Sequence, residues 1–250
     1  MHQRDIDTAV GLLVAARRTG AWLESLPPAA QPADLAEAHA IQDATVAALG
    51  DSVAGWKVSM YQGQVMRGII LGSCRLDSPA AIPARQVPLL GLEGEIGFRF
   101  ERDLPPRDRD YDRDEIAAAA TAFVGIEIVA SRFRNYQDTP ALHRTADCMS
   151  NGVYVVGTLR PDWREHALDQ LEATLAINGE IIVRKRGEHP AGDPLLPAIA
   201  LVNALRGSSG VRAGQIITTG TCTGIPFGRP GDHVTVSFTD FGLAEIDLSI

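Results

Sequence analysis

The sequence predicts an α+β protein that combines an antiparallel or mixed β-sheet with helices at its N-terminus. Three observations support this prediction. The first part of the chain spaces its apolar residues as helices do. From Asp51 onward, short apolar runs alternate with Gly and Pro, which is typical of strands and turns. Few helical patterns separate these runs, which disfavours a doubly wound parallel sheet.

Residues 1–50 are expected to form an N-terminal helical segment. Gly20 ends a first stretch whose apolar residues recur at helical spacing: Ile6, Val10, Leu13 and Val14. Prolines then interrupt the chain. Asp34 and Glu37 resemble a capping box that opens a second helix, which runs to Leu49 and ends before Gly50.

Residues 51–250 are expected to form the β-rich domain. Two helices are predicted within it, over Asp114–Ala122 and from Asp193 to Gly207, the second with Pro194 at its first position. The candidate strands are Gly55–Met60, Leu89–Phe100, Phe123–Ala130, Gly152–Thr158, Gln170–Val183, Gln215–Thr219, His233–Phe238 and Leu243–Ile250.

The composition argues against several classes of function. The formal net charge is -8 and the sequence pI is about 5.2, which argues against nucleic acid or an anionic membrane as the main partner. Cys74, Cys148 and Cys222 form no CxxC pair, so a zinc knuckle or dithiol redox motif is excluded. Free thiols and the lack of a signal peptide or membrane span predict a cytoplasmic protein.

Carboxylates on two candidate strands are the first chemical signal. Glu93 and Glu95 fall on one face of the strand Leu89–Phe100, where they repel each other unless a cation lies between them or water covers that face. Glu127 lies inside a continuous apolar run and therefore needs a partner. That partner is either an arginine, Arg132 or Arg134, or a metal ion shared with Glu93 and Glu95.

Three carboxylates without clustered His or Cys would form an all-oxygen site. Such a site suits Mg²⁺, Mn²⁺ or Ca²⁺ and disfavours zinc. Protein ligands would leave part of the coordination sphere open, which is typical of a catalytic site. A nearby base would then help to bind an anionic ligand. Lys57 is the candidate, unless it lies on an exposed strand face.

Two further segments are chemically suggestive. The small residues around Gly220 and Thr221 permit a tight turn whose N–H groups could hold a carboxylate, although a plain hairpin would look the same. His143 is either a base that activates water or a histidine of a surface loop. Cys148 and Cys222 have no neighbours that would activate a thiol, so both are interpreted as packing residues.

Taken in order, these segments resemble the fumarylacetoacetate hydrolase superfamily, and within it the 2-keto-4-pentenoate hydratase and 4-oxalocrotonate decarboxylase branch. The resemblance runs from about Leu35 to the C-terminus. It rests on GWK, ExE, an apolar strand with one Glu, SNGVYVVG, AGDPLLPAIALVNAL, GTCTG and RPGD.

The resemblance implies a mixed β roll or sandwich with flanking helices. It also implies Mg²⁺ or Mn²⁺, with Ca²⁺ as a substitute in crystals, bound by Glu93, Glu95 and Glu127. Lys57 would be the family lysine, and Gly220 and Thr221 would lie beside the substrate carboxylate. The stretch ADCMSNG resembles the family's ADNASSG-like segment, and it places three residues near the pocket: Asp147 in a catalytic role, and Ser150 and Asn151 as substrate-binding residues.

The implied enzyme is a hydratase of aromatic-compound degradation and a homo-oligomer. It would add water to a 2-hydroxy-dienoic or 2-oxo-alkenoic acid through an enolate that the metal stabilises. Lys57 would supply positive charge or shuttle a proton, with a pKa that burial beside a cation could lower. The same site would serve an acylpyruvate-type C–C hydrolase or a 2-oxo-acid decarboxylase. A catalytically silent partner subunit is the alternative from another class.

The chain departs from this branch after Lys57. The stretch VSMYQGQVMRGIILGS is shorter than the family's, and Met66 or Arg67 stands where an acid is expected. We therefore expect a different substrate lid, and a different proton-transfer residue, from those of the hydratases.

Overall fold

The computed structural model describes all residues, 1–250, and begins with a helical segment. Helix α1 spans Gln3–Thr19 and α2 spans Leu35–Leu49. The Asp34 side chain accepts a hydrogen bond from the Glu37 N–H, which caps α2, and Gly50 ends that helix in the left-handed conformation. Both predicted N-terminal helices are confirmed.

The central element is a seven-stranded mixed sheet in the order β2-β1-β10-β5-β6-β7-β3. Strand β1 pairs parallel with β10, and β3 pairs parallel with β7, while the other neighbours are antiparallel. The strands are β1 Val53–Tyr61, β2 Gln64–Leu71, β3 Arg75–Asp77, β5 Gly91–Phe100, β6 Ala120–Val129, β7 Asn151–Arg160 and β10 Ile216–Thr221.

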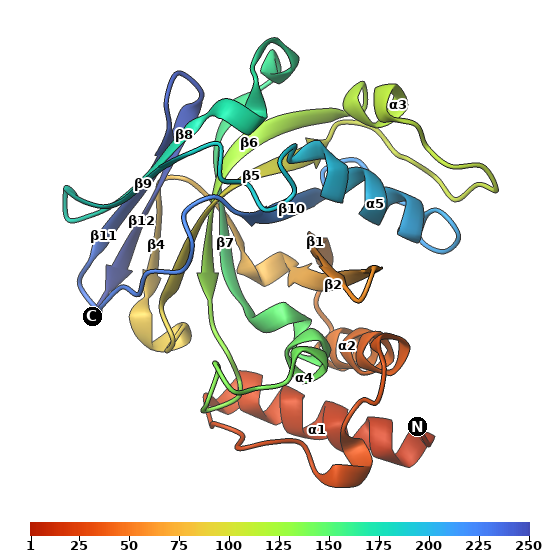
Figure 1. The fold of residues 1–250 in the computed structure, drawn as a ribbon. Helices are drawn as coiled ribbons and strands as arrows, with labels where there is room; N and C mark the ends of the chain where they lie inside the picture. The colour runs from red at the N-terminus through yellow and green to blue at the C-terminus, as the bar shows by residue number, and fades with distance from the viewer.

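A second sheet of five strands, in the order β4-β12-β11-β8-β9, packs against β6 and β7 (Figure 1). Its strands are β4 Ala80–Pro83, β8 Glu172–Ile177, β9 Glu180–Arg186, β11 His233–Phe238 and β12 Gly242–Ser249. The apolar face of β5 carries Leu92 and Ile96, which are fully buried in the main core with Val234 of β11. The predicted α+β class with a mixed sheet is confirmed.

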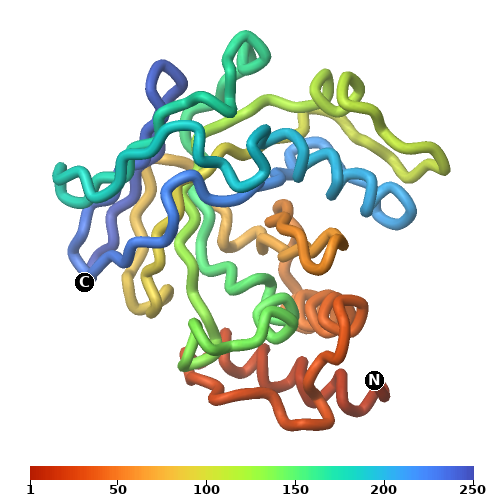
Figure 2. Tube along the Cα trace, in the orientation of Figure 1, coloured from red at the N-terminus to blue at the C-terminus, as the bar shows by residue number.

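Three further helices lie outside the sheets: α3 Arg113–Ala117, α4 Ala141–Ala146 and α5 Leu195–Leu205. Figure 2 follows the tube from the red N-terminal helices to the green α4, which packs against α2. Helix α5 lies over the other end of the seven-stranded sheet, near β10 and β1. No helix in the structure is long and apolar enough to cross a membrane.

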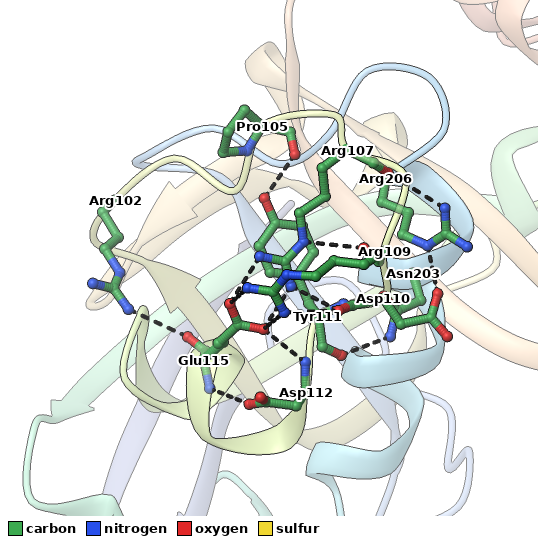
Figure 3. A network of polar contacts seen from close by, with 10 residues as sticks. All are labelled: Arg102, Pro105, Arg107, Arg109, Asp110, Tyr111, Asp112, Glu115, Asn203 and Arg206. Atoms are coloured by element: carbon green, nitrogen blue, oxygen red, sulfur yellow. Dashed lines mark hydrogen bonds and ion pairs between the residues drawn. The ribbon is translucent and has the colours of Figure 1, made fainter.

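The charged loop before α3 is fixed in place. Arg107 and Arg109 both donate to the Glu115 carboxylate, and the Arg107 guanidinium lies 3.3 Å from the centroid of the Tyr111 ring (Figure 3). The two arginines hold the pKa of Glu115 below its usual range. Asn203 of α5 accepts from the Tyr111 N–H, so the network joins this loop to α5.

Some boundaries differ from the prediction. The expected strand Gln170–Val183 is a hairpin, β8 and β9, which turns at Asn178 and Gly179 with φ of 52° and 81°. Asn-Gly favours this turn because both residues adopt the left-handed conformation readily. The helix expected over Asp114–Ala122 ends at Ala117, because β6 takes over from Ala120.

The N-terminal segment shares its small core with residues from later in the chain. Leu13 of α1 and Ile41 of α2 are fully buried, together with Phe133 and Ala146. The N-terminal helices therefore do not bury their apolar faces alone. The boundary at residue 50 stays a prediction.

We expect Phe133→Ala to lower the free energy of unfolding by about 3–5 kcal/mol, because it leaves a cavity where two parts of the chain meet. Urea denaturation measures this loss. Phe227→Ala is the matched control, since the Phe227 side chain is 47% exposed. Equal losses in the two variants would contradict a structural role for the N-terminal core.

Candidate metal centre

Three carboxylates converge on one face of the seven-stranded sheet. Glu93 of β5 lies directly opposite Glu127 of β6, and Glu95 follows two residues along β5 on the same face. One carboxylate oxygen from each residue lies within 4.8 Å of the others. The pairing of β5 with β6, rather than sequence proximity, therefore creates the cluster.

Two of these carboxylates are held away from water, and Glu93 is half-buried. Glu127 is fully buried and Glu95 is 2% exposed. Burial raises the pKa of Glu93 to about 8, and the charge of Glu127 adds to this shift. Burial also raises the pKa of Glu95 and of Glu127. Without a cation, the cluster is thus an energetic cost to the fold.

Lys57 is the one basic side chain that touches the cluster. Its Nζ lies 2.6 Å from Glu127 Oε1 and donates to the Met149 carbonyl at 2.8 Å. Burial would lower the pKa of Lys57, but Glu127 and Glu93 outweigh burial and raise it above the usual value. Without a cation, the neighbouring carboxylates thus favour the charged ammonium of Lys57. The lowered pKa expected for Lys57 beside a bound cation stays a prediction.

A strained turn supplies the carbonyl that Lys57 contacts. Cys148, Met149 and Ser150 have φ of 53°, 52° and 57°, all in the left-handed region that L-residues avoid. Gly68, opposite Lys57 in the β1–β2 pairing, leaves the space, because a Cβ there would lie 2.7 Å from the Cys148 carbonyl oxygen. The β1–β2 hairpin thus carries Lys57 and also leaves the space for the turn at Cys148, Met149 and Ser150.

Tyr154 of β7 covers the cluster from the other side. Its hydroxyl donates to Glu95 Oε2 at 3.2 Å, and the side chain is fully buried. Gly125 makes this reach possible, because a Cβ on Gly125 would lie 2.1 Å from the Tyr154 hydroxyl oxygen. Sequence reasoning missed this residue, since an aromatic residue in an apolar strand gives no functional signal.

A cavity of about 510 Å³ opens above the carboxylates and Lys57. Glu93 and Glu95 line it from β5, while Gly220 and Thr221 line it at the end of β10, where the pairing with β5 shifts register. The structure therefore brings these predicted residues to one place.

The shortened segment after Lys57 forms a tight hairpin. Gln62 and Gly63 turn with φ of 49° and 78°, and Met66 lines the cavity. Arg67 instead pairs with Asp43 of α2 at 2.7 Å. Neither Met66 nor Arg67 therefore supplies the acidic side chain that is expected at this position in the family.

His143 and Asp147 do not line the cavity. Helix α4 presents Ala141, Arg144 and Thr145 to it, at the i, i+3 and i+4 positions of one face. His143 points away, and its ring centroid lies 5.9 Å from that of Phe133. This placement does not suit the expected role of His143 in activating water.

Asp147 is fully buried between two arginines. Both of its carboxylate oxygens accept from Arg132 Nε at 2.7 Å, and Arg17 Nη2 donates to Oδ1 at 3.1 Å. This placement does not suit the predicted catalytic role of Asp147. We propose a structural role instead: Asp147 joins the N-terminal helix α1 to the end of α4.

Ser150 and Asn151 do not line the cavity. Both are buried, and the side-chain polar atoms of both lack hydrogen-bond partners. Burial raises the pKa of Glu127, and Lys57 and the neighbouring Asn151 side chain offset part of that rise. Cys222 is buried, and burial raises its pKa to about 12, so its thiol stays protonated and suits packing.

Arg144 and Tyr136 line the cavity but were not expected there. The spacing of Ala141, Arg144 and Thr145 could have indicated a shared helix face. Helix α4 is too short for that pattern to stand out in the sequence.

The donor set fits a hard divalent cation. It consists of three carboxylates. Glu127 Oε1 pairs with Lys57, whereas Glu127 Oε2 is buried and accepts no hydrogen bond of normal geometry. A buried acceptor without such a donor is rare and indicates a missing partner. Carboxylate oxygens without thiolate or imidazole are typical of Mg²⁺ and Mn²⁺ sites.

Comparison with known proteins gives one matching family model. Residues 73–248 match the model described as fumarylacetoacetate (FAA) hydrolase C-terminal. A 2-keto-4-pentenoate hydratase of Paraburkholderia phymatum is 29% identical over 228 residues, which cover 86% of each chain.

Solved structures share the fold. The 4-oxalocrotonate decarboxylase from Pseudomonas putida G7, complexed with magnesium and adipate, superposes with a TM-score of 0.86 at 18% identity and covers 99% of this chain and 98% of its own. A fumarylpyruvate hydrolase from Pseudomonas aeruginosa, with Mn²⁺ and pyruvate, gives 0.54 at 14% identity, over 74% of this chain and 79% of its own.

For metal-free protein in EDTA, we expect Glu93 to lower the free energy of unfolding progressively as the pH rises from about 4.5 to about 8. Glu93 binds a proton in the folded state up to about pH 8 but loses it near the ordinary glutamate pKa of 4.5 when unfolded. Urea denaturation at pH 6 and pH 8 measures the slope, which Glu93→Gln should reduce. Mn²⁺ binding to that variant should weaken by about 10-fold or more in calorimetry. An unchanged slope and affinity would remove Glu93 from the site.

We expect Asp147→Asn to lower the free energy of unfolding by about 3–5 kcal/mol, because it leaves two guanidinium groups without their buried carboxylate. Mn²⁺ affinity should stay within a few-fold of wild type. Asp43→Asn is the control: its side chain is 52% exposed in a surface pair, which is worth about 1 kcal/mol or less. A fully stable Asp147→Asn protein without turnover would instead support a catalytic role.

Proposed function

The chain belongs to the fumarylacetoacetate hydrolase family, and from this membership we propose that it is a divalent-metal hydratase acting on a 2-hydroxy-dienoic or 2-oxo-alkenoic acid. The observation that carries the proposal is the buried cluster of Glu93, Glu95 and Glu127, with Lys57 beside it, below an open cavity. The similarity to 2-keto-4-pentenoate hydratases supports this choice of reaction.

Glu93, Glu95 and Glu127 would hold Mg²⁺ or Mn²⁺. The bound ion supplies a Lewis acid that stabilises negative charge on the substrate's 2-oxygen. The three carboxylates and the Lys57 ammonium together leave two negative charges, which a divalent ion offsets. An anionic substrate can then approach a site that no longer repels it.

Gly220 and Thr221 are proposed to bind the carboxylate next to the 2-oxygen. The ladder between β10 and β5 shifts register between Thr218 and Thr221, beside the cavity. An interrupted ladder leaves backbone polar groups free for a ligand. Gly220, with φ of 109°, allows the chain to turn there without a side chain in the way.

Lys57 is proposed to donate the proton that a substrate carbon takes up during hydration. Water bonds through its oxygen to C4 of the 2-oxo-3-alkenoic form and gives up one proton, while negative charge shifts to the 2-oxygen. Protonation of C3 then gives the 4-hydroxy-2-oxo acid, so one proton leaves the water and one is added to carbon. The Lys57 ammonium, with a raised pKa, carries a proton at Nζ. The Met149 carbonyl and Glu127 fix the direction of that group. Lys57 can therefore donate a proton at the floor of the cavity.

The test is turnover of 2-hydroxypenta-2,4-dienoate and 2-hydroxyhexa-2,4-dienedioate, followed by loss of dienol absorbance and product analysis. We expect hydration with Mg²⁺ or Mn²⁺ and none with EDTA. Acylpyruvates and 4-oxalocrotonate, tested in parallel, would reveal a C–C hydrolase or a decarboxylase instead. Absence of turnover of every acid, with metal bound, would favour the catalytically silent subunit. A homo-oligomer also stays a prediction.

We expect Lys57→Met to lower kcat by about 10²- to 10⁴-fold, because it removes the proton donor. Lys185→Met is a matched control. These are the chain's two lysines, and Lys185 pairs with Glu188 on an exposed strand. Mn²⁺ binding by calorimetry shows whether Lys57→Met keeps an intact site. Normal turnover in Lys57→Met would contradict this role.

A further inference from the structure

The cavity has a second cationic group, separate from its floor. Arg144 of α4 lines the cavity and is half-buried. Its guanidinium forms no ion pair and donates no hydrogen bond within the protein. The guanidinium carbon lies 5.3 Å from the centroid of the Tyr136 ring, which is its one recorded side-chain partner.

The other charged residues of the site form one cluster with Lys57. Lys57 pairs with Glu127 beside Glu93 and Glu95. Arg144 lies beyond ion-pair distance of all these carboxylates. Its planar set of N–H donors is thus available to a ligand, and a carboxylate matches that set with two parallel hydrogen bonds.

Exposure and supporting element separate the two cationic positions. Lys57 of β1 is 8% exposed, whereas Arg144 of α4 is half-buried. Arg144 lies on the α4 wall, together with Ala141 and Thr145. Methionine side chains contribute the adaptable apolar surface that an unsaturated carbon chain would contact: Met60, Met66 and Met149.

Arg144 is also held in place. Helix α4 is anchored at its end by Asp147, which both Arg17 and Arg132 contact. Stacking on Tyr136 restricts the guanidinium further. A group fixed before the ligand arrives binds more tightly, because less freedom is lost on binding.

We propose that Arg144 binds a carboxylate at the far end of the substrate, and that the preferred substrates are therefore dicarboxylic 2-oxo or 2-hydroxy-dienoic acids. This inference rests on the proposed function, which places the first carboxylate and the 2-oxygen at the floor. It adds a specificity-determining residue that matches none of the segments carrying the family resemblance.

Binding of unreactive acids of equal chain length tests the proposal. With Mn²⁺-loaded protein, calorimetry compares 2-oxoadipate with 2-oxohexanoate, which lacks only the distal carboxylate. We expect wild type to bind the diacid at least about 10-fold more tightly, as a charge-assisted pair of hydrogen bonds allows. Arg144→Met should remove this preference by weakening the diacid alone, and Arg144→Lys should retain part of it.

Arg212→Met is the matched control, because Arg212 is an exposed arginine without an ion pair and lines a different cavity. It should keep the wild-type preference. Equal binding of both acids by wild type would overturn the inference alone. So would an equal loss for both acids in Arg144→Met, since Arg144 would then bind the first carboxylate. Failure of both acids to bind, with Mn²⁺ still bound, would overturn the proposed function and this inference with it.

Discussion

Three carboxylates on two neighbouring strands, two of them buried, are the constraint around which the site is arranged. Direct pairing of Glu93 with Glu127 puts like charges opposite each other on one face, which destabilises a sheet. One ammonium, from Lys57, cannot offset three carboxylates. The fold tolerates this arrangement because the opposite face of β5 is packed into the main core, with Leu92 and Ile96 fully buried. Stability from one face thus supports an unfavourable cluster on the other.

Around Lys57, too, the fold accepts a conformational cost in order to hold one side chain in position. Three successive left-handed residues cost roughly 1–2 kcal/mol each, and their turn places the Met149 carbonyl against Nζ. Arginine contacts at Asp147, just before the turn, hold it in that conformation. The chain otherwise uses arginine heavily and has only two lysines. A compact ammonium that exchanges its proton suits this position, whereas a guanidinium would stay charged.

Local patterns in the sequence revealed the parts of the site that one strand or turn defines. Alternation along Leu89–Phe100 put Glu93 and Glu95 on one face, and an apolar run around Glu127 required a partner for that carboxylate. The choice between an arginine and the other carboxylates depended on the pairing of β5 with β6. Arg132 instead contacts Asp147, which sequence spacing did not indicate. Long-range pairing of this kind follows from the topology of the whole sheet.

Helix α4 shows why residues that are close in sequence lie on different sides of the cavity wall. Its short length gave no periodic signal, so His143, Arg144 and Asp147 could not be assigned to faces beforehand. In the structure, His143 and Asp147 face the N-terminal helices, whereas Arg144 faces the cavity. The N-terminal segment thus shapes the cavity indirectly, because it fixes the helix that carries Arg144. A change in the packing of α1 or α2 would therefore shift the α4 wall of the cavity, although no residue before Lys57 lines that cavity.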